Sequence, residues 1–189
     1  MENNMIEKIT NYFVVNELIK DEDKEIYAYG LHQGLLILIN IITTILIGFI
    51  FKAVWESILF IIVYTPLRAY GGGYHAKTEV KCYLFSIALI LVVLLGIKII
   101  PDTDLIILAL TEVGGIIIWF LAPVEDSNKP LDKEERIIYK KRTGIILTTE
   151  IIITISLLVL NFKEIALVMA ISIFVVSLML VLGKKVNKD

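Results

Sequence analysis

The chain's single cysteine and one of its two histidines stand close together, and such a pair is the smallest set of side chains that supports thiol catalysis. Cys82 follows His75 by seven residues, and three glycines, Gly71 to Gly73, come just before them. An imidazole can take the proton of a thiol, and the thiolate can then attack a carbonyl carbon. The pair predicts a cysteine nucleophile. The alternative is an inert apolar cysteine and a solvated histidine.

The local structure around Cys82 decides whether this chemistry is possible. Cys82 falls in the first turn of a predicted helix, where a Thr78 cap and the partial positive charge of the N-terminus would favour the thiolate. In one continuous helix, seven residues rise about 10.5 Å, which is too far for a hydrogen bond between the two side chains. The chain must therefore bend before Cys82. The backbone amides near Gly71 to Gly73 could form an oxyanion hole.

The elements that position this segment are expected to be membrane helices. Hydrophobic residues make up 57% of the 189, and the mean hydropathy is +0.81, whereas soluble domains are about 45–50% apolar. The excess lies in long runs between short polar stretches, which is the pattern of bilayer-spanning helices. We predict an all-α fold, a polytopic helical bundle of about six transmembrane helices after an N-terminal amphipathic helix. The expected spans are 31–50, 53–67, 82–100, 105–124, 144–160 and 165–182.

The whole chain, 1–189, is predicted to be a single integral membrane domain. Its expected parts are the amphipathic segment 1–29, the bundle 31–183, and two polar loops, 68–81 and 125–142. The second span is short, about 22 Å against a hydrocarbon core of roughly 30 Å, and Pro66 is expected to end it. Non-helical backbone from Arg68 onward would then begin below the membrane surface. Backbone at that depth is tolerated only inside protein or beside water.

The basic residues predict the orientation. With six spans, 15 of the 18 Lys and Arg residues lie on one side of the membrane, together with both termini. Because basic loops stay in the cytoplasm, both termini are expected there. The stretch that ends the second loop carries four of these residues and no acid: Arg136, Lys140, Lys141 and Arg142. It is either an orientation signal alone or a surface that binds an acidic peptide or an anionic lipid.

Other classes of function are excluded or kept open by composition. A net charge of −2 with scattered basic residues does not predict nucleic-acid binding. One cysteine cannot form an internal disulfide, and no ligand spacing suggests a metal site. Glu56 and Glu112 lie inside predicted spans, where carboxylates are functional candidates, whereas Glu150 at the start of a span is less surprising. Glu56 and Glu112 would suit a small peptide transporter, which is the alternative function. A structural membrane subunit without a site is a third.

Two motifs resemble those of a known family. The pattern Arg68-x-x-x-Gly-Gly-x-His75, followed by Cys82 at the head of a span, is similar to the accessory gene regulator B (AgrB) family. The later segment Pro123-x-x-x-x-Asn128-Lys-Pro-Leu is similar to it as well. Members of this family are bacterial membrane cysteine endopeptidases of peptide quorum sensing. The resemblance covers nearly the whole chain.

The resemblance implies a concrete reaction. Cys82 would be the nucleophile and His75 the general base in cleaving a precursor peptide on the cytoplasmic face of a bacterial cell membrane. The precursor would have an amphipathic start, an internal Cys or Ser and an acidic tail, and its acyl-enzyme thioester would cyclise to a thiolactone or lactone. No metal or organic cofactor is implied, and a homodimer stays open. Arg68 and the three glycines, Gly71, Gly72 and Gly73, would shape the site. A third catalytic member stays open among Asp126, Asn128 and Glu79.

Overall fold

The described residues of the protein are almost entirely helical. A computed structural model describes residues 2–74, 76, 78–125 and 131–186. The elements are α1 (Glu2–Val15), the short 3-10 turn η1 (Asp21–Asp23), α2 (Lys24–Phe51), α3 (Val54–Gly71), α4 (Glu79–Ile99), α5 (Asp104–Leu121), α6 (Lys133–Val159) and α7 (Lys163–Val186). No strand forms among these residues, although one isolated bridge joins Gly72 to Val124. The all-α prediction is confirmed.

The chain divides into two compact units, residues 1–43 and 44–189, and the organisation as a single domain stays a prediction. In the first unit the segment 1–29, expected as one amphipathic helix, contains a break. The helix α1 ends at Val15, because Glu17 adopts a left-handed φ of 56° and the Leu18 amide donates back to the Phe13 carbonyl at 2.9 Å. The apolar face of α1 buries Ile6 within this unit.

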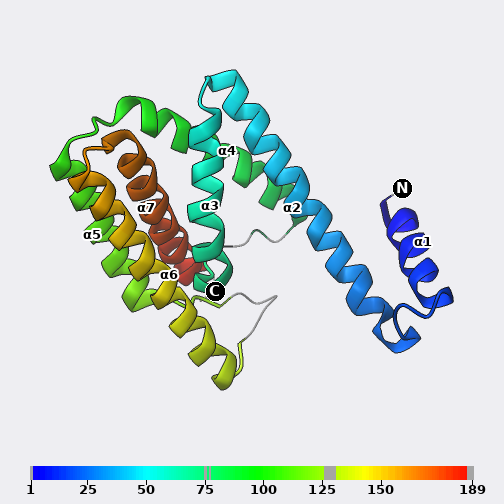
Figure 1. The fold of residues 1–189 in the computed structure, drawn as a ribbon. Helices are drawn as coiled ribbons and strands as arrows, with labels where there is room; N and C mark the ends of the chain where they lie inside the picture. Colours follow the sequence, from blue (N-terminus) through cyan, green and yellow to red (C-terminus); the bar gives the residue numbers. More distant parts are fainter. Residues whose placement is uncertain (1, 75, 77, 126–130, 187–189) are drawn as a thin grey trace. The chain divides into compact units, whose positions relative to one another are not determined.

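The second unit is built around α7. This helix contacts α3, α4, α5 and α6, and most of its residues from Ala166 to Leu180 are buried. Figure 1 shows α7 between α5, α6 and α3. The helices α5 and α7 approach closely: a Cβ added to Gly114 would lie 3.0 Å from the Cα of Phe174. Small residues permit such close helix contact in membranes, where van der Waals packing holds helices together.

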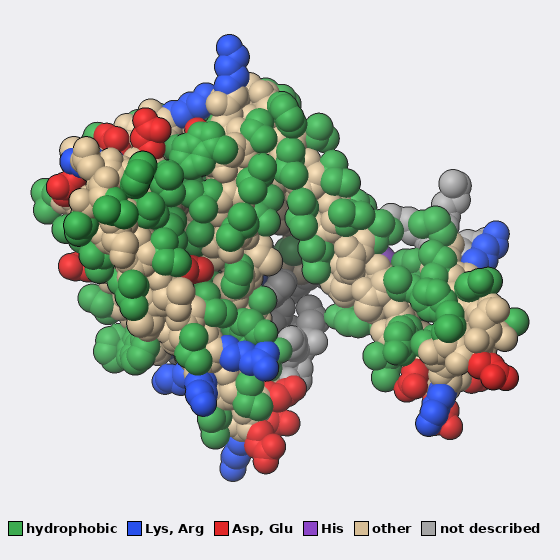
Figure 2. Space-filling view, in the orientation of Figure 1, with side chains coloured by type: hydrophobic (Ala, Val, Ile, Leu, Met, Phe, Trp, Pro, Cys, Tyr) green, Lys and Arg blue, Asp and Glu red, His purple; other side chains and the backbone are tan. Residues whose placement is uncertain are grey.

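Among the described residues, five helical segments are long and apolar enough to cross a membrane: α4, α5, α6, α7 and the segment Asp21–Phe51 that contains α2. They match five of the six expected spans, and the protein is a multi-pass membrane protein. Figure 2 shows hydrophobic side chains covering the flanks of the helices. The sixth expected span corresponds to α3, whose 18 residues include Glu56 and Arg68, and its crossing stays a prediction.

The helix α3 also shows that one expectation was wrong. Pro66 does not end the helix, which continues to Gly71. A proline removes one backbone hydrogen bond, but α3 packs against α6 and α7, and such packing compensates for the lost bond. With 18 residues, α3 is about 27 Å long. Non-helical backbone therefore begins at Gly72, four residues later than expected.

The second polar loop is shorter than expected. The helix α6 begins at Lys133, so residues 133–142 of the predicted loop 125–142 are helical. Asp132 caps this helix in a capping box with Glu135: the Asp132 side chain accepts from the Glu135 amide at 2.7 Å, and the Glu135 side chain accepts from the Asp132 amide at 3.1 Å. This reciprocal bonding satisfies the first free amides and starts the helix in the polar region.

Candidate active site

Residues 71–74, here called the glycine segment, lie at the end of α3 and just after it. They are held by backbone hydrogen bonds from two distant parts of the chain. The Val124 amide donates to the Gly71 carbonyl at 2.9 Å, and the Gly73 amide donates to the Val124 carbonyl at 3.3 Å. The Tyr74 amide donates to the Met179 carbonyl of α7 at 2.9 Å. The backbone that leads to His75 is thus fixed against the connection after α5 and against α7.

Close packing explains the glycines in this segment. Gly72 has a φ of 72°, and a Cβ there would lie 2.0 Å from the Val124 carbonyl oxygen. Gly73 has a φ of 126°, and its Cβ would lie 2.9 Å from the Met179 carbonyl oxygen. On α7, a Cβ at Gly183 would lie 2.4 Å from the Gly73 carbonyl carbon. By contrast, a Cβ at Gly71 would meet nothing closer than 3.7 Å. Gly72, Gly73 and Gly183 are therefore required, and Gly71 is not.

The expected oxyanion hole is not available in this conformation. The Gly72 amide donates to the Arg68 carbonyl at 3.1 Å, and the amides of Gly73 and Tyr74 are engaged as described above. An amide that already donates within the protein cannot donate to a reacting oxygen as well without losing its partner. This expectation from the sequence was wrong, because the glycine amides serve to anchor the segment.

Arg68 links the end of α3 to this segment. Its Nη2 donates to the carbonyl oxygen of Tyr74, the residue before His75. Its Nη1 is buried and has no hydrogen-bond partner among the described residues. The Tyr74 ring packs edge-on against Phe85 of α4, with 5.2 Å between ring centroids. Arg68 and Tyr74 together connect α3, the glycine segment and α4.

Cys82 occupies the first turn of α4 and is half-buried. The Thr78 side chain accepts a hydrogen bond from the Lys81 amide at 3.3 Å, which confirms the expected cap. Because α4 begins only at Glu79, the chain is not one continuous helix before Cys82. His75 lies outside the described residues, so the bend back toward Cys82 stays a prediction. Phe85 follows Cys82 by three residues, so the Tyr74 ring packs on the side of α4 that carries Cys82.

Tyr64 is a site residue that the sequence analysis missed. It lies one turn before Arg68 on α3 and stacks on Phe60, with 4.9 Å between ring centroids. The Arg68 guanidinium and the Cys82 thiol are both among the groups that act on the Tyr64 hydroxyl. The one available signal was the four-residue spacing of Phe60, Tyr64 and Arg68, which places them on one helix face.

Several predicted residues lie outside the described part of the chain. These are His75, Asp126 and Asn128. Of the three candidates for a third catalytic member, only Glu79 is described, and it is exposed in the first turn of α4, three residues before Cys82. The role of each of these residues therefore remains a prediction.

The predicted basic cluster begins α6 and lies beside the glycine segment. Thr143 of α6 approaches Gly71, with 3.7 Å between its Cγ2 and a Cβ placed on the glycine. Arg142 donates to the Tyr70 hydroxyl at 2.7 Å and covers the Tyr70 ring. Arg136 forms an ion pair with Glu125. Lys140 and Lys141 are exposed. Two members of the cluster are thus held within the protein, and two project into solvent.

The acids inside the spans are distributed differently from what the sequence suggested. Glu112 is exposed on α5, whereas Glu56 is half-buried and Glu150 is 7% exposed. One carboxyl oxygen of Glu56 and one of Glu150 are buried without a hydrogen-bond partner among the described residues. Glu150, which appeared the least surprising of the three in the sequence, is the most buried.

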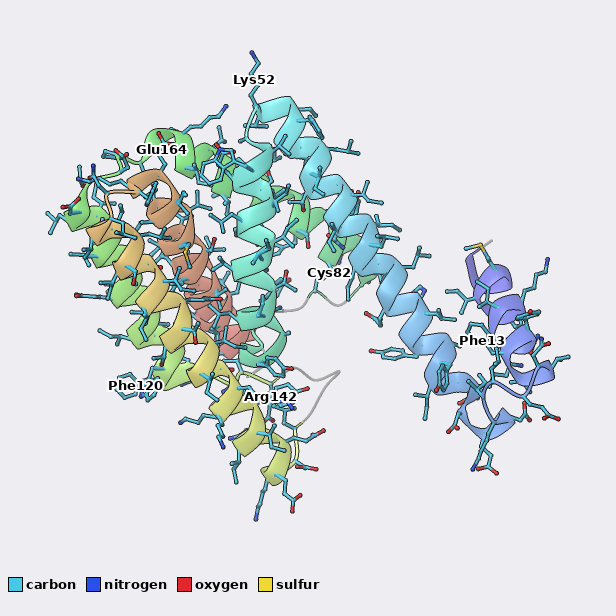
Figure 3. All side chains as sticks on the ribbon, viewed as in Figure 1. Phe13, Lys52, Cys82, Phe120, Arg142 and Glu164 are labelled. Atoms are coloured by element: carbon cyan, nitrogen blue, oxygen red, sulfur yellow. The ribbon has the colours of Figure 1, made fainter. Side chains whose placement is uncertain are left out.

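Three regions that the positions of the basic residues place on one side of the membrane meet at one end of the second unit. These are the end of α3, the connection from α5 to α6, and the last turns of α7, which the contacts of Gly72, Gly73 and Gly183 bring together. Figure 3 shows Arg142 at this end, with Lys52 and Glu164 at the opposite end and Cys82 where α4 begins. Lys163 pairs with Asp104 at that opposite end, at 2.6 Å.

Comparisons with known proteins agree on one family. The family model described as accessory gene regulator B matches residues 6–180. A protein named putative AgrB-like protein 2 of Clostridium perfringens strain 13 is 31% identical over 151 residues, which cover 73% of this chain and 68% of that protein. A putative AgrB-like protein of strain SM101 is 30% identical over 145 residues, 72% of this chain and 66% of that protein. No solved structure matches.

Proposed function

Since the chain belongs to the accessory gene regulator B family, which acts in quorum sensing, we propose that it is a membrane cysteine endopeptidase. It removes the C-terminal tail of a quorum-sensing propeptide and supports cyclisation to a thiolactone or lactone. The observation that carries this proposal is the position of the chain's only thiol. Cys82 is half-buried in the capped first turn of α4, beside the anchored segment that leads to His75.

The reaction uses the pair in two steps. His75 takes the thiol proton, and the Cys82 Sγ attacks the carbonyl carbon of the scissile peptide bond. The C–N bond then breaks, the amine of the tail leaves with the proton from His75, and a thioester remains on Cys82. A thiol or hydroxyl within the peptide attacks this thioester, closes the ring and releases Cys82. Because the thioester retains much of the energy that hydrolysis would release, ring closure is feasible.

The substrate would approach from the end of the bundle where α6 begins. Lys140 and Lys141 are exposed there, and the Tyr70–Arg142 contact lies next to Gly71. We assign the acidic tail of the precursor to this basic surface, made by Arg136, Lys140, Lys141 and Arg142. The face is cytoplasmic and the termini lie in the cytoplasm, as the positive-inside rule favours.

Replacement of the nucleophile tests the proposal in proteoliposomes supplied with a precursor peptide. Cys82→Ala should abolish cleavage, and Cys82→Ser should nearly abolish it, because a hydroxyl is a poorer nucleophile beside an imidazole. His75→Ala should also block cleavage, with partial rescue at raised pH, where thiolate forms without a base. His32→Ala, which removes the chain's other histidine, is the matched control and should cleave normally.

Mass spectrometry provides the second measurement. A precursor without its internal Cys or Ser should still be cut and should leave an acyl group on Cys82 that hydroxylamine removes. Cleavage by Cys82→Ala at the wild-type rate would show that the peptidase proposal is wrong. Movement of intact peptide across the membrane by that variant would favour the transporter instead.

A further inference from the structure

The first turns of α4, which carry Cys82, lie outside the hydrophobic core of the second unit. The buried residues of this helix, Ile90, Val93 and Leu94, all lie in its second half. The first apolar residue of α4 that packs against the core is Ile87, five residues after Cys82 and about 7.5 Å farther along the helix. Burial in the core therefore does not fix the thiol, and contacts near the start of α4 determine where it lies.

Tyr74 supplies such a contact. Its ring packs edge-on against Phe85, with 5.2 Å between the ring centroids and 62° between the ring planes, which is an arrangement that aromatic pairs prefer. Phe85 lies about one turn after Cys82, so the two residues are neighbours on the surface of α4. The ring contact thus joins the turns of α4 that carry the thiol to the residue that precedes His75 in the chain.

Tyr74 is itself held at both of its backbone polar groups. Its amide donates to the Met179 carbonyl of α7 at 2.9 Å, and its carbonyl accepts from Arg68 Nη2 of α3. A side chain whose backbone is fixed by hydrogen bonds and whose ring is packed keeps a defined position. Through Tyr74, the two helices α3 and α7 therefore fix the start of a third, α4.

We propose that Tyr74 and Phe85 are positioning residues, whose ring contact holds the Cys82 thiol in place for proton transfer to His75. The inference rests on the proposed function. Neither ring takes part in bond making, so the contact acts on the fraction of molecules in which thiol and base are aligned. Misplacement of reacting groups by about 1 Å can cost about 100-fold in rate, so a contact that fixes one turn of a helix affects the chemical step.

Alkylation of the thiol measures this alignment without a precursor peptide. The chain has one cysteine, so iodoacetamide reports on Cys82 alone among its thiols, and mass spectrometry follows the reaction of the full chain in proteoliposomes. The thiolate displaces iodide from a saturated carbon. The rate at neutral pH follows the thiolate fraction, which an aligned imidazole raises by taking the thiol proton.

Two neighbouring residues of α4 provide the variant and its control. Phe85→Ala removes the ring, whereas Leu84→Ala removes an exposed apolar side chain beside it, and alanine favours the helix in both. Phe85→Ala should slow alkylation by about tenfold, the upper end for loss of one aromatic pair. Leu84→Ala should react as the wild type does. Tyr74→Ala should match Phe85→Ala, and Tyr74→Phe, which keeps the ring, should restore most of the lost rate.

The same substitution in a His75→Ala background separates positioning from a general effect on the helix. His75→Ala should itself slow alkylation, because the thiol loses its base. With no imidazole left to align, Phe85→Ala should then cause no further fall. Such non-additivity is the expected result for residues that act together on one step.

An equal fall on Phe85→Ala in both backgrounds would overturn the proposal, since the ring would then act on the helix and not on the alignment. An unchanged rate in Phe85→Ala, or an equal fall in Leu84→Ala or Tyr74→Phe, would overturn it too. If Phe85→Ala does not elute as a single species in detergent, Phe85→Leu, which keeps an apolar side chain, decides by the same comparison. The proposed function fails by a different result, normal cleavage of a precursor by Cys82→Ala, so the two failures are distinguishable.

Discussion

The adjacent glycines Gly71 and Gly72 offer a matched pair for testing how the site is built. Gly72→Ala adds a methyl group where 2.0 Å separates it from the Val124 carbonyl oxygen, in a backbone conformation with φ 72° and ψ −150° that only glycine adopts readily. Gly71→Ala adds the same methyl group one residue earlier, at the end of α3, where the nearest atom is 3.7 Å away.

The magnitude follows from the contacts that Gly72→Ala disturbs. The backbone strain costs about 1–3 kcal/mol. Relief of the clash moves the glycine segment away from Val124. This movement breaks two hydrogen bonds, from the Val124 amide to the Gly71 carbonyl at 2.9 Å and from the Gly73 amide to the Val124 carbonyl at 3.3 Å. Each is worth about 0.5–1.5 kcal/mol. Even the lower limits amount to about 2 kcal/mol, which corresponds to about a 30-fold loss of the competent site. Gly71→Ala should instead be neutral or stabilise α3 by about 0.5–1 kcal/mol, because alanine favours a helix.

The assay compares initial rates of tail release from a precursor peptide in proteoliposomes, normalised to the protein that elutes as a single species in detergent. We expect at least about a 30-fold loss in Gly72→Ala and wild-type activity in Gly71→Ala. A wild-type rate in Gly72→Ala would refute the reasoning, since it would show that contact with Val124 does not support the site. An equal loss in Gly71→Ala would also refute it.

Three further outcomes can be measured. Cysteines introduced near Lys141 in a Cys82→Ala background should resist a membrane-impermeant thiol reagent added to intact cells, whereas one near Lys163 should react; labelling near Lys141 from outside would contradict the orientation. Replacement of Lys140 and Lys141 by Gln should raise KM and weaken its salt dependence without changing kcat, because both are exposed and would attract an acidic tail through solvent; unchanged kinetics in a correctly inserted variant would leave these residues an orientation role only. Gly114→Ala should lower the midpoint of thermal unfolding by forcing α5 from α7, at a cost of about 1–3 kcal/mol; Gly144→Ala, whose Cβ would have 3.5 Å of space, is the control.

Local signals in the sequence explain which parts of the fold were predictable. Long apolar runs must form helices in a bilayer, so the helices and the family resemblance followed from composition and motifs. The Thr78 cap was also readable, since it depends on neighbouring residues alone. The start of α6 was missed although Asp132 and Glu135 have the spacing of a capping box. The expectation that Pro66 ends the helix was wrong because the effect of a proline on a helix depends on the helices packed around it.

The sequence by itself determined the membrane helices, the one thiol and the motif around it. Only the tertiary structure decided how that motif is held, because its partners are distant along the chain. Val124, Met179 and Gly183 carry no chemical signal of their own. Backbone atoms of Val124 and Met179 nevertheless form hydrogen bonds with residues 71–74, and the close approach of all three leaves no room for a side chain at Gly72 or Gly73. Every residue type offers the same backbone atoms for such hydrogen bonds and contacts, so a sequence pattern does not reveal them. For that reason the glycines, which were expected to donate to a reacting oxygen, instead anchor the segment, and Arg68 Nη1 is a buried donor without a partner among the described residues.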